Sequence, residues 1–279
     1  MGARDQHVID FYVNHPISAE HIMARLREER GSLDDVRPEE LYPLDEDHYG
    51  ALDANEALAE RTGMAAGDRV LDLCAGLCGP ARWFARQRGV TVVGLDITPL
   101  RVEGAKELNA LVGLQDAVEP VLGDAMDLPF ADASFDAAVS QEAFLHITDK
   151  LRALREIHRV LRPGKRVSFT DWIMPRPLPQ AEQDRMWAGF GAQALQSIPG
   201  YEALLREAGF AVVSAEDTTE SWGEILAKRL EMYRRLNAEA EAAGHPSEKH
   251  GFIEDYTAFV TDVQTHRLGG ARLTAEKPG

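Results

Sequence analysis

The sequence has few cysteines, no long apolar run and a deficit of basic residues. Its 279 residues include two cysteines, Cys74 and Cys78, which are too few for the three or four ligands that a zinc or iron–sulfur centre usually takes. No apolar stretch reaches the ~20 residues of a membrane-spanning helix, and the first residues lack the apolar core of a signal peptide. We therefore expect a cytoplasmic protein without a metal centre, and without a disulfide, because disulfides are rare in a reducing compartment.

Basic residues are outnumbered by acidic ones. Lys and Arg together number 30 and Asp and Glu 46, which gives a formal net charge of −16. A surface this acidic repels phosphate backbones and anionic lipid, because affinity for nucleic acid comes largely from neutralising phosphates. The composition therefore predicts that neither nucleic acid nor a membrane is a partner.

From Arg69 onward, short apolar runs alternate with helical segments, which is typical of a doubly wound, mostly parallel α/β sheet. Strands are expected at 70–73, 91–95, 118–122, 135–140, 165–170 and 211–213, with a last edge strand at 271–275. Helices are expected at 99–112, 150–161, 183–195, 221–240 and 249–266, and another begins at Pro80. The pattern predicts a helical cap over residues 1–66 and a domain over 67–279, with a helical insertion at about 219–269.

A turn of small residues follows the first expected strand. From Asp72 it reads D-L-C-A-G-L-C, at the carboxyl end of the first strand, where a parallel α/β sheet builds a nucleotide-type pocket. A dinucleotide fingerprint, G-x-G-x-x-G, would place a glycine at Cys74, whereas Gly76 and Gly79 are kept. The turn by itself leaves the kind of cofactor open.

Further motifs follow in order along residues 68–172. Asp96 ends the second expected strand, where a carboxylate in nucleotide folds binds ribose hydroxyls, and Asp124 follows the third in Gly-Asp-Ala. Arg159-Val-Leu-Arg-Pro-Gly-Lys connects a helix to the fifth strand. Together with D-x-C-x-G-x-C, this series resembles the class I S-adenosylmethionine-dependent methyltransferases, with cysteine in place of the first and third glycines of their acidic-x-Gly-x-Gly-x-Gly motif.

The resemblance implies a Rossmann-like α/β fold and S-adenosyl-L-methionine as the cofactor. It also implies a set of cofactor-binding residues around the carboxyl ends of the strands. These are Asp72, Ala75, Gly76, Asp96, Ile97, Asp124, Ala125 and Gln141.

Within this superfamily, the chain is similar to the sarcosine/dimethylglycine N-methyltransferases. The similarity is carried by Ser-Gln-Glu-Ala-Phe-Leu-His over 140–146, by Thr-Asp-Trp over 170–172 and by Gly269-Gly270. It implies in-line transfer of a methyl group to a small-molecule acceptor, at an amine nitrogen, and allows for a homodimer. Three alternatives stay open: an O- or C-methyltransferase of a secondary metabolite, an NAD-dependent oxidoreductase, and a cofactor-binding protein without catalysis.

Three residues are candidates for the chemistry. Gln141 would face the methionine portion and the transferring methyl, and His146 would orient the acceptor or take a proton near neutral pH. Tyr49 would touch the methionine end or the acceptor. His146 and Tyr49 are equally consistent with packing, and Glu142 is expected to be a solvated or capping carboxylate. The acceptor, the atom methylated and the number of methyl groups are not predicted.

Overall fold

The computed structural model describes residues 3–13, 17–45, 48–242 and 252–279. Four α-helices and a short 3-10 helix precede the sheet: α1 (Ala3–Val13), α2 (Ala19–Arg30), η1 (Pro38–Glu40), α3 (Tyr42–Asp45) and α4 (Ala51–Thr62). The later helices are α5 (Gly79–Arg88), α6 (Pro99–Leu111), η2 (Phe144–His146), α7 (Lys150–Val160), α8 (Gln180–Phe190), α9 (Ile198–Glu207), α10 (Thr219–Ala242) and α11 (Phe252–Gln264).

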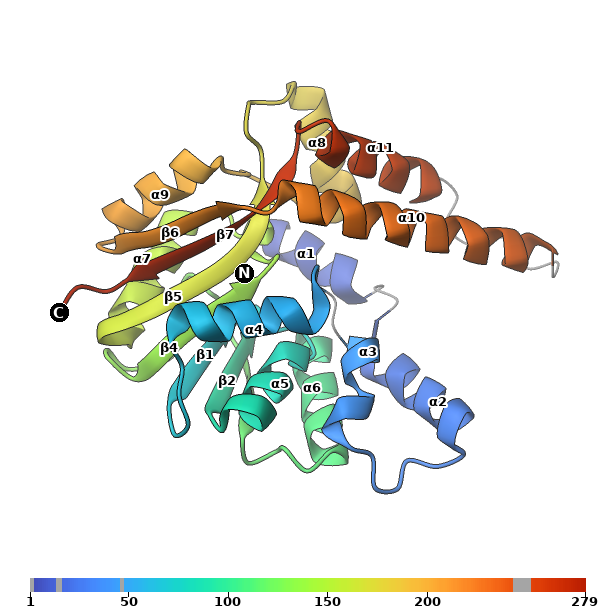
Figure 1. Cartoon of the computed structure of the whole chain (residues 1–279), viewed down its shortest axis with the longest axis horizontal. Coiled ribbons are helices and arrows are strands. Elements are labelled where there is room, and N and C mark those ends of the chain that lie inside the picture. Colours follow the sequence, from blue (N-terminus) through green and yellow to red (C-terminus); the bar gives the residue numbers. More distant parts are fainter. Residues whose placement is uncertain (1–2, 14–16, 46–47, 243–251) are drawn as a thin grey trace.

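The described residues form one sheet of seven strands in the order β3-β2-β1-β4-β5-β7-β6. The strands are β1 (Arg69–Leu73), β2 (Thr91–Asp96), β3 (Val118–Leu122), β4 (Phe135–Gln141), β5 (Leu161–Ile173), β6 (Ala211–Asp217) and β7 (Gly269–Glu276). The first five pair in parallel, and β7 runs antiparallel to both of its neighbours. Helices cover both faces of the sheet (Figure 1). This confirms the predicted doubly wound, mostly parallel fold.

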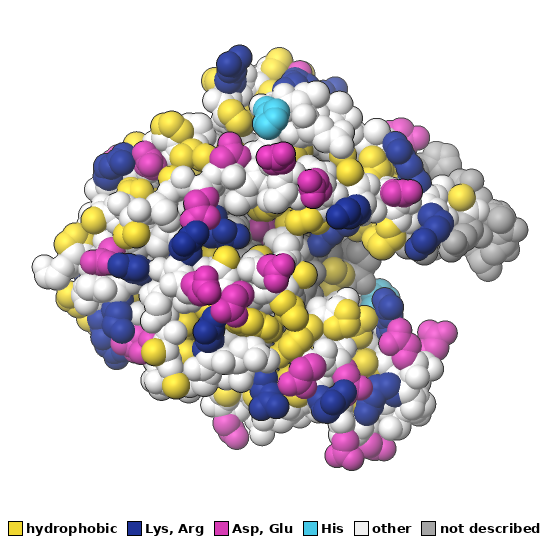
Figure 2. Space-filling view, in the orientation of Figure 1, with side chains coloured by type: hydrophobic (Ala, Val, Ile, Leu, Met, Phe, Trp, Pro, Cys, Tyr) yellow, Lys and Arg dark blue, Asp and Glu magenta, His cyan; other side chains and the backbone are white. Residues whose placement is uncertain are grey.

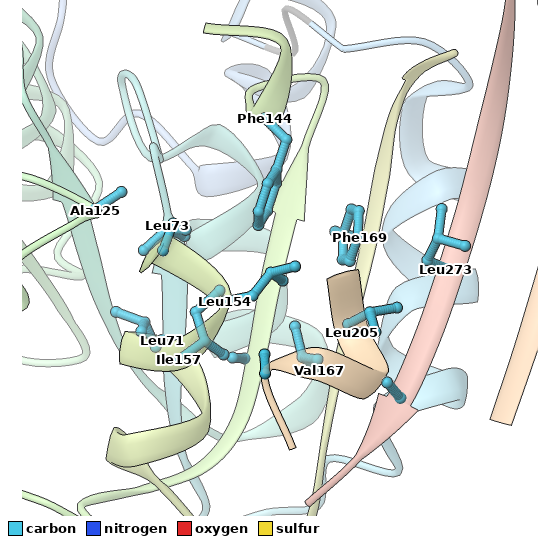
Figure 3. Close-up of a cluster of buried hydrophobic side chains, with 14 of the residues drawn as sticks. Leu71, Leu73, Ala125, Phe144, Leu154, Ile157, Val167, Phe169, Leu205 and Leu273 are labelled. Atoms are coloured by element: carbon cyan, nitrogen blue, oxygen red, sulfur yellow. The ribbon is translucent and has the colours of Figure 1, made fainter. Parts of the chain in front are cut away.

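Successive residues of β1 point to opposite faces of the sheet, and both faces are buried. Leu71 and Leu73 pack against one layer that includes Leu154 of α7, whereas Val70 packs on the other face with Leu58 of α4. Figure 3 shows the first layer, in which side chains from α7 and α9 interlock with those of the sheet. Burial of each such leucine contributes about 2 kcal/mol, which explains why the strand is apolar from Val70 to Leu73 except at Asp72.

The last strand, β7, is not an edge strand as predicted, because it lies between β5 and β6. The two glycines at its start allow a close approach by the beginning of α10. A Cβ atom on Gly269 would lie 2.1 Å from Oγ1 of Thr219, and one on Gly270 would lie 2.3 Å from Cδ2 of Trp222. The glycine pair therefore has a packing function, and β6 takes the edge of the sheet.

Three other boundaries differ from the sequence pattern. β5 begins at Leu161 rather than at 165, and its pairing with β4 is interrupted by a bulge, where the missing N–H of Pro163 is tolerated. The helix expected over 183–195 is α8, which ends before Gly191 in a left-handed C-cap. α9 was not predicted, although its signals are present: Ser197 accepts a hydrogen bond from the backbone of Gly200, and a proline opens the first turn.

Candidate active site

A cavity of about 940 Å³ opens at the carboxyl ends of the parallel strands, where α/β sheets bind ligands. The space-filling view is hollowed between α10 and the segment that contains α2 and α3 (Figure 2). Every site residue predicted from the sequence lines this one cavity: Tyr49, Asp72, Ala75, Gly76, Asp96, Ile97, Asp124, Ala125, Gln141 and His146.

The turn after β1 has a backbone that normally requires glycine. Cys74, Gly76 and Cys78 have φ angles of 58°, 55° and 60°, in the left-handed region that non-glycine residues rarely adopt. Both thiols are free, and a Cβ on Gly94 of β2 would lie 2.5 Å from Sγ of Cys78. The two cysteines therefore act as small residues in a tight turn, as the sequence predicted.

The turn is tied to Asp96 at the end of β2. Its Oδ2 accepts the backbone N–H of Gly76, and its Oδ1 accepts that of Thr98, both at 2.8 Å. Burial raises the pKa of Asp96 above its usual range, although these hydrogen bonds and Arg101 oppose the shift. The two oxygens of a carboxylate together offer about four acceptor positions, so Asp96 keeps acceptor capacity for a ligand hydroxyl beside these protein donors.

Two acceptor atoms on neighbouring strands lack a hydrogen-bond partner among the described residues: Oδ2 of Asp72 and Oε1 of Gln141. The amide nitrogen of Gln141 donates to Asn55 at 2.8 Å. This bond fixes the orientation of the side-chain amide and therefore of its oxygen. Burial raises the pKa of Asp72 to about 7, and His48 partly offsets this shift. Buried acceptors without donors favour a ligand that brings positive charge and N–H groups, such as the ammonium of a methionine moiety.

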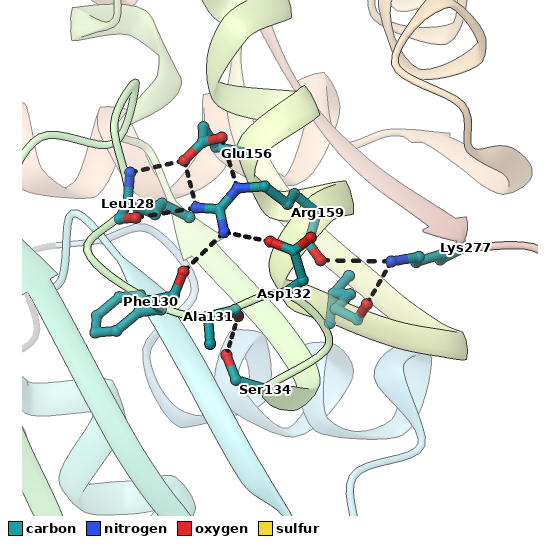
Figure 4. A network of polar contacts seen from close by, with 9 residues as sticks. Leu128, Phe130, Ala131, Asp132, Ser134, Glu156, Arg159 and Lys277 are labelled. Atoms are coloured by element: carbon teal, nitrogen blue, oxygen red, sulfur yellow. Dashed lines mark hydrogen bonds and ion pairs between the residues drawn. The ribbon is translucent and has the colours of Figure 1, made fainter.

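The loop that contains Asp124 is held by Arg159 of α7 (Figure 4). The guanidinium donates to the backbone carbonyls of Leu128 and Phe130 at 3.0 and 2.7 Å. It also donates to the carboxylates of Asp132 and Glu156. Within the loop, Oδ1 of Asp124 accepts the backbone N–H of Met126 at 2.8 Å. Sequence reasoning used Arg159 only as part of a connector motif and missed that it holds this loop.

His146, in η2, is oriented from both sides of its ring. Its Nδ1 lies 3.1 Å from the carbonyl oxygen of Gly191, and its Nε2 lies 2.8 Å from the hydroxyl of Tyr12 in α1. Because a carbonyl only accepts, Nδ1 carries the proton, so in the neutral form of the ring Nε2 presents its lone pair to Tyr12. Sequence reasoning missed Tyr12, since no local pattern connects two residues so far apart in the chain.

Glu142 is half-buried and lines the cavity with φ of 43°. Its Oε2 accepts the backbone N–H of Tyr49 at 2.8 Å. Because Tyr49 precedes the N-cap of α4, which receives no side-chain cap hydrogen bond, Glu142 does not cap this helix. Burial raises its pKa. The ring of Tyr49 lies under the guanidinium of Arg229, with 4.9 Å from its centroid to Cζ, and meets Trp222 edge-on. Glu142 thus ties the segment before α4 to β4, and Arg229 ties the same segment to α10.

The far side of the cavity is largely aromatic. Its wall includes Trp172, Phe190, Tyr233, Tyr256 and Phe259, drawn from β5, α8, α10 and α11. The rings of Trp172 and Phe259 stack with centroids 4.2 Å apart. A wall of this kind binds apolar surface and excludes water.

No group of three or more His, Cys, Asp or Glu side chains within residues 3–13, 17–45, 48–242 and 252–279 is arranged to hold a metal ion. Over the same ranges, the helices are too short or too polar to span a bilayer.

The chain is similar to known methyltransferases. A family model described as a methyltransferase domain matches residues 71–169. The 27-O-demethylrifamycin SV methyltransferase of Amycolatopsis mediterranei (strain S699) is 33% identical over 226 residues, which cover 80% of this chain and 82% of that protein. Phosphoethanolamine N-methyltransferase 1 of Arabidopsis thaliana is 29% identical over 208 residues, covering 75% of this chain and 39% of that protein.

A solved structure shows the same fold. A protein assigned as a sarcosine dimethylglycine methyltransferase from Galdieria sulphuraria superposes with a TM-score of 0.74 and 23% identity, over 93% of this chain and 98% of that one. The predicted superfamily and cofactor are confirmed, and the oxidoreductase and non-catalytic alternatives are wrong. The finer resemblance to N-methyltransferases is not established, because relatives named for oxygen and for nitrogen acceptors both match. The chain belongs to the S-adenosyl-L-methionine-dependent methyltransferases that act on small molecules.

Proposed function

We propose that this enzyme transfers the methyl group to a hydroxyl oxygen of a small molecule with a large apolar surface. The observation that carries the proposal is the Tyr12–His146 pair beside an aromatic cavity wall. It offers a basic nitrogen next to a pocket suited to apolar ligands. The relative with 33% identity, named for a 27-O-demethylated acceptor, supports oxygen as the acceptor atom.

The cofactor end of the cavity suits S-adenosylmethionine. Asp96 would bind the ribose hydroxyls, and Asp124 with the backbone of Ala125 would bind the adenine edge. Asp72 and Gln141 would hold the methionine end, where their unpartnered oxygens lie, with Ala75, Gly76 and Ile97 lining the turn. The cofactor supplies a methyl group already activated on a sulfonium, so the protein mainly has to position the acceptor and exclude water.

An oxygen acceptor must lose its proton as the new bond forms. In the tautomer set by Gly191, Nε2 of His146 is the atom that accepts protons. We infer that the acceptor hydroxyl passes its proton to this nitrogen, either by displacing the hydroxyl of Tyr12 or through it. The bond from Nδ1–H to the Gly191 carbonyl would then stabilise the imidazolium.

An amine acceptor, the first prediction from the sequence, is the second candidate. Aromatic faces at Tyr49 and Trp172 would attract a methylated ammonium, and a tertiary amine that arrives neutral needs no base. The same cavity must hold the cofactor as well as the acceptor, so the aromatic wall is the better guide to the acceptor. Sarcosine and dimethylglycine offer little apolar surface to that wall, and an amine with a larger apolar part would cover it better.

The test measures release of S-adenosylhomocysteine with two acceptor panels. One contains apolar alcohols and phenols, and the other contains glycine, sarcosine, dimethylglycine and bulkier amines. We expect release with a hydroxylated acceptor, the methylated oxygen identified by mass and NMR, and a loss of at least about 100-fold in kcat for His146→Gln. The control His21→Gln, on α2 and outside the cavity, should keep wild-type rates. Turnover confined to amines, or unchanged in His146→Gln, would refute the proposal.

A further inference from the structure

The η2 turn that contains His146 is held by polar groups from three other parts of the chain. Leu145 donates its backbone N–H to Oδ1 of Asp171 at 3.0 Å, and Gln193 donates its own N–H to the carbonyl of Leu145 at 2.8 Å. The amide nitrogen of Gln193 donates to the carbonyl of His146 itself at 2.6 Å. The backbone on both sides of the imidazole is therefore fixed by groups outside the turn.

Asp171 is held in turn by Tyr201 of α9. The tyrosine hydroxyl donates to Oδ2 of Asp171, and both side chains are completely buried. The ring of Tyr201 also packs edge-on against Phe144, the first residue of η2, with centroids 6.3 Å apart. Asp171 thus accepts hydrogen bonds from both η2 and Tyr201, and Tyr201 itself packs on η2.

Lys150, the first residue of α7, also holds η2, through the residue that follows it. It is 3% exposed, and its Nζ donates to the carbonyls of Ile147 at 2.9 Å and of Gln193 at 3.0 Å. It therefore joins the residue after His146 to the segment that holds His146. We call the four residues Lys150, Asp171, Gln193 and Tyr201 the η2 cradle.

Burial of these charges is costly. It raises the pKa of Asp171 and lowers the pKa of Lys150, and the attraction between the two groups opposes both shifts. Apolar replacements of buried ion pairs are often neutral or stabilising, so stability alone does not account for a carboxylate and an ammonium here. Their common effect is to fix one backbone turn at the edge of the cavity.

We propose that the η2 cradle is a positioning device, which holds the His146 imidazole where Nε2 faces the acceptor and Nδ1 meets Gly191. The proposal rests on the proposed function, in which His146 accepts the acceptor's proton. The cradle residues act through the turn and do not line the cavity. A displacement of about 1 Å in a reacting group can cost about 100-fold in rate. The loss of a single hydrogen bond in the η2 cradle should therefore lower the rate of methyl transfer.

The test uses two conservative variants. Gln193→Met removes the donor to the His146 carbonyl, and Tyr201→Phe removes the donor to Asp171 while keeping the ring. We expect kcat/KM to fall about tenfold in each, mostly through kcat, with the cofactor Kd unchanged. The acid limb of the kcat/KM–pH profile should move, as should the titration of the His146 Cε1 resonance, identified by its absence in His146→Gln.

The matched control is Ser168→Ala, on the same strand as Asp171. It removes buried hydrogen bonds to Leu273 and Thr274 of β7, which do not involve η2, and should lose stability while keeping the His146 titration and kcat/KM. If Gln193→Met and Tyr201→Phe behave like this control, the cradle has no positioning role. If His146→Gln keeps full turnover, the proposed base is wrong, and the His146 titration in the two cradle variants still decides whether the cradle orients the ring.

Discussion

Replacing Asp72 with asparagine should abolish most of the pH dependence of cofactor binding. Asp72 is buried, its Oδ2 has no hydrogen-bond partner among the described residues, and burial raises its pKa to about 7. A cationic methionine end beside it would favour the ionised carboxylate and lower that pKa. Cofactor affinity should therefore rise with pH as Asp72 ionises in the ligand-free protein.

The size of the effect follows from the pKa. A group with a pKa of about 7 is roughly 3% ionised at pH 5.5 and roughly 97% ionised at pH 8.5. If the ionised form provides the attraction, the ratio of the Asp72→Asn Kd to the wild-type Kd should grow by up to about thirtyfold between these pH values. Asp96, whose pKa is also raised, titrates in both proteins, so the ratio isolates Asp72.

Titration calorimetry with S-adenosylhomocysteine, which keeps the ammonium, measures this ratio. The two Kd values should converge near pH 5.5 and separate toward pH 8.5, and a ratio that stays constant would refute the assignment of Asp72. The stability of the ligand-free protein should depend on pH in the opposite direction. Because the pKa of Asp72 is higher in the folded protein than its unfolded value of 3.8, the free energy of unfolding should fall as the pH rises from about 4 to about 7. Asp72→Asn should not show this fall.

Three further predictions concern residues outside the cofactor contacts. Arg82 and Asp45 form a fully buried ion pair, with Nη2 and Oδ2 2.5 Å apart, so Arg82→Met should lower the free energy of unfolding by about 3–5 kcal/mol in urea titrations. The double variant Arg82→Met/Asp45→Leu should recover most of that loss, and an equal loss in the single and the double variant would contradict this prediction. Arg159→Gln should raise the cofactor Kd about tenfold with little change in kcat, because the loop of Asp124 loses its clamp; an unchanged Kd would argue against this role. Tyr12→Phe should slow transfer to a hydroxyl acceptor about tenfold, the scale of one lost hydrogen bond, and an equal effect on cofactor binding would point to packing instead.

The end of the cavity where we propose that the cofactor binds was predictable from the sequence because its geometry is local. Parallel strands bring their carboxyl ends to one edge of the sheet, so Asp72, Asp96 and Asp124 had to converge once the strands were recognised. The small residues of the turn after β1 also followed from the motif. The structure added the left-handed backbone at Cys74 and Cys78, where the sequence showed only a substitution of glycines.

The acceptor half was not predictable, since its residues come together from distant segments. The pattern indicated His146 but neither Tyr12 nor Gly191, which set its tautomer. The periodicity of a sequence does not show which side chains from distant segments come into contact.

The division into a cap over 1–66 and a domain over 67–279 stays a prediction.

The sequence by itself determined the order of strands and helices, the parallel sheet and the carboxylates at its edge, because alternating apolar runs and strand-end residues act through neighbours in the chain. Only the tertiary structure decided that β7 enters the sheet between β5 and β6, that Glu142 accepts the backbone N–H of Tyr49, and that three buried residues and the half-buried Gln193 surround η2. These outcomes depend on close approaches such as that of Gly270 to Trp222 and on the burial of charged side chains against residues distant in the sequence. Both are decided by how the side chains pack in the folded protein.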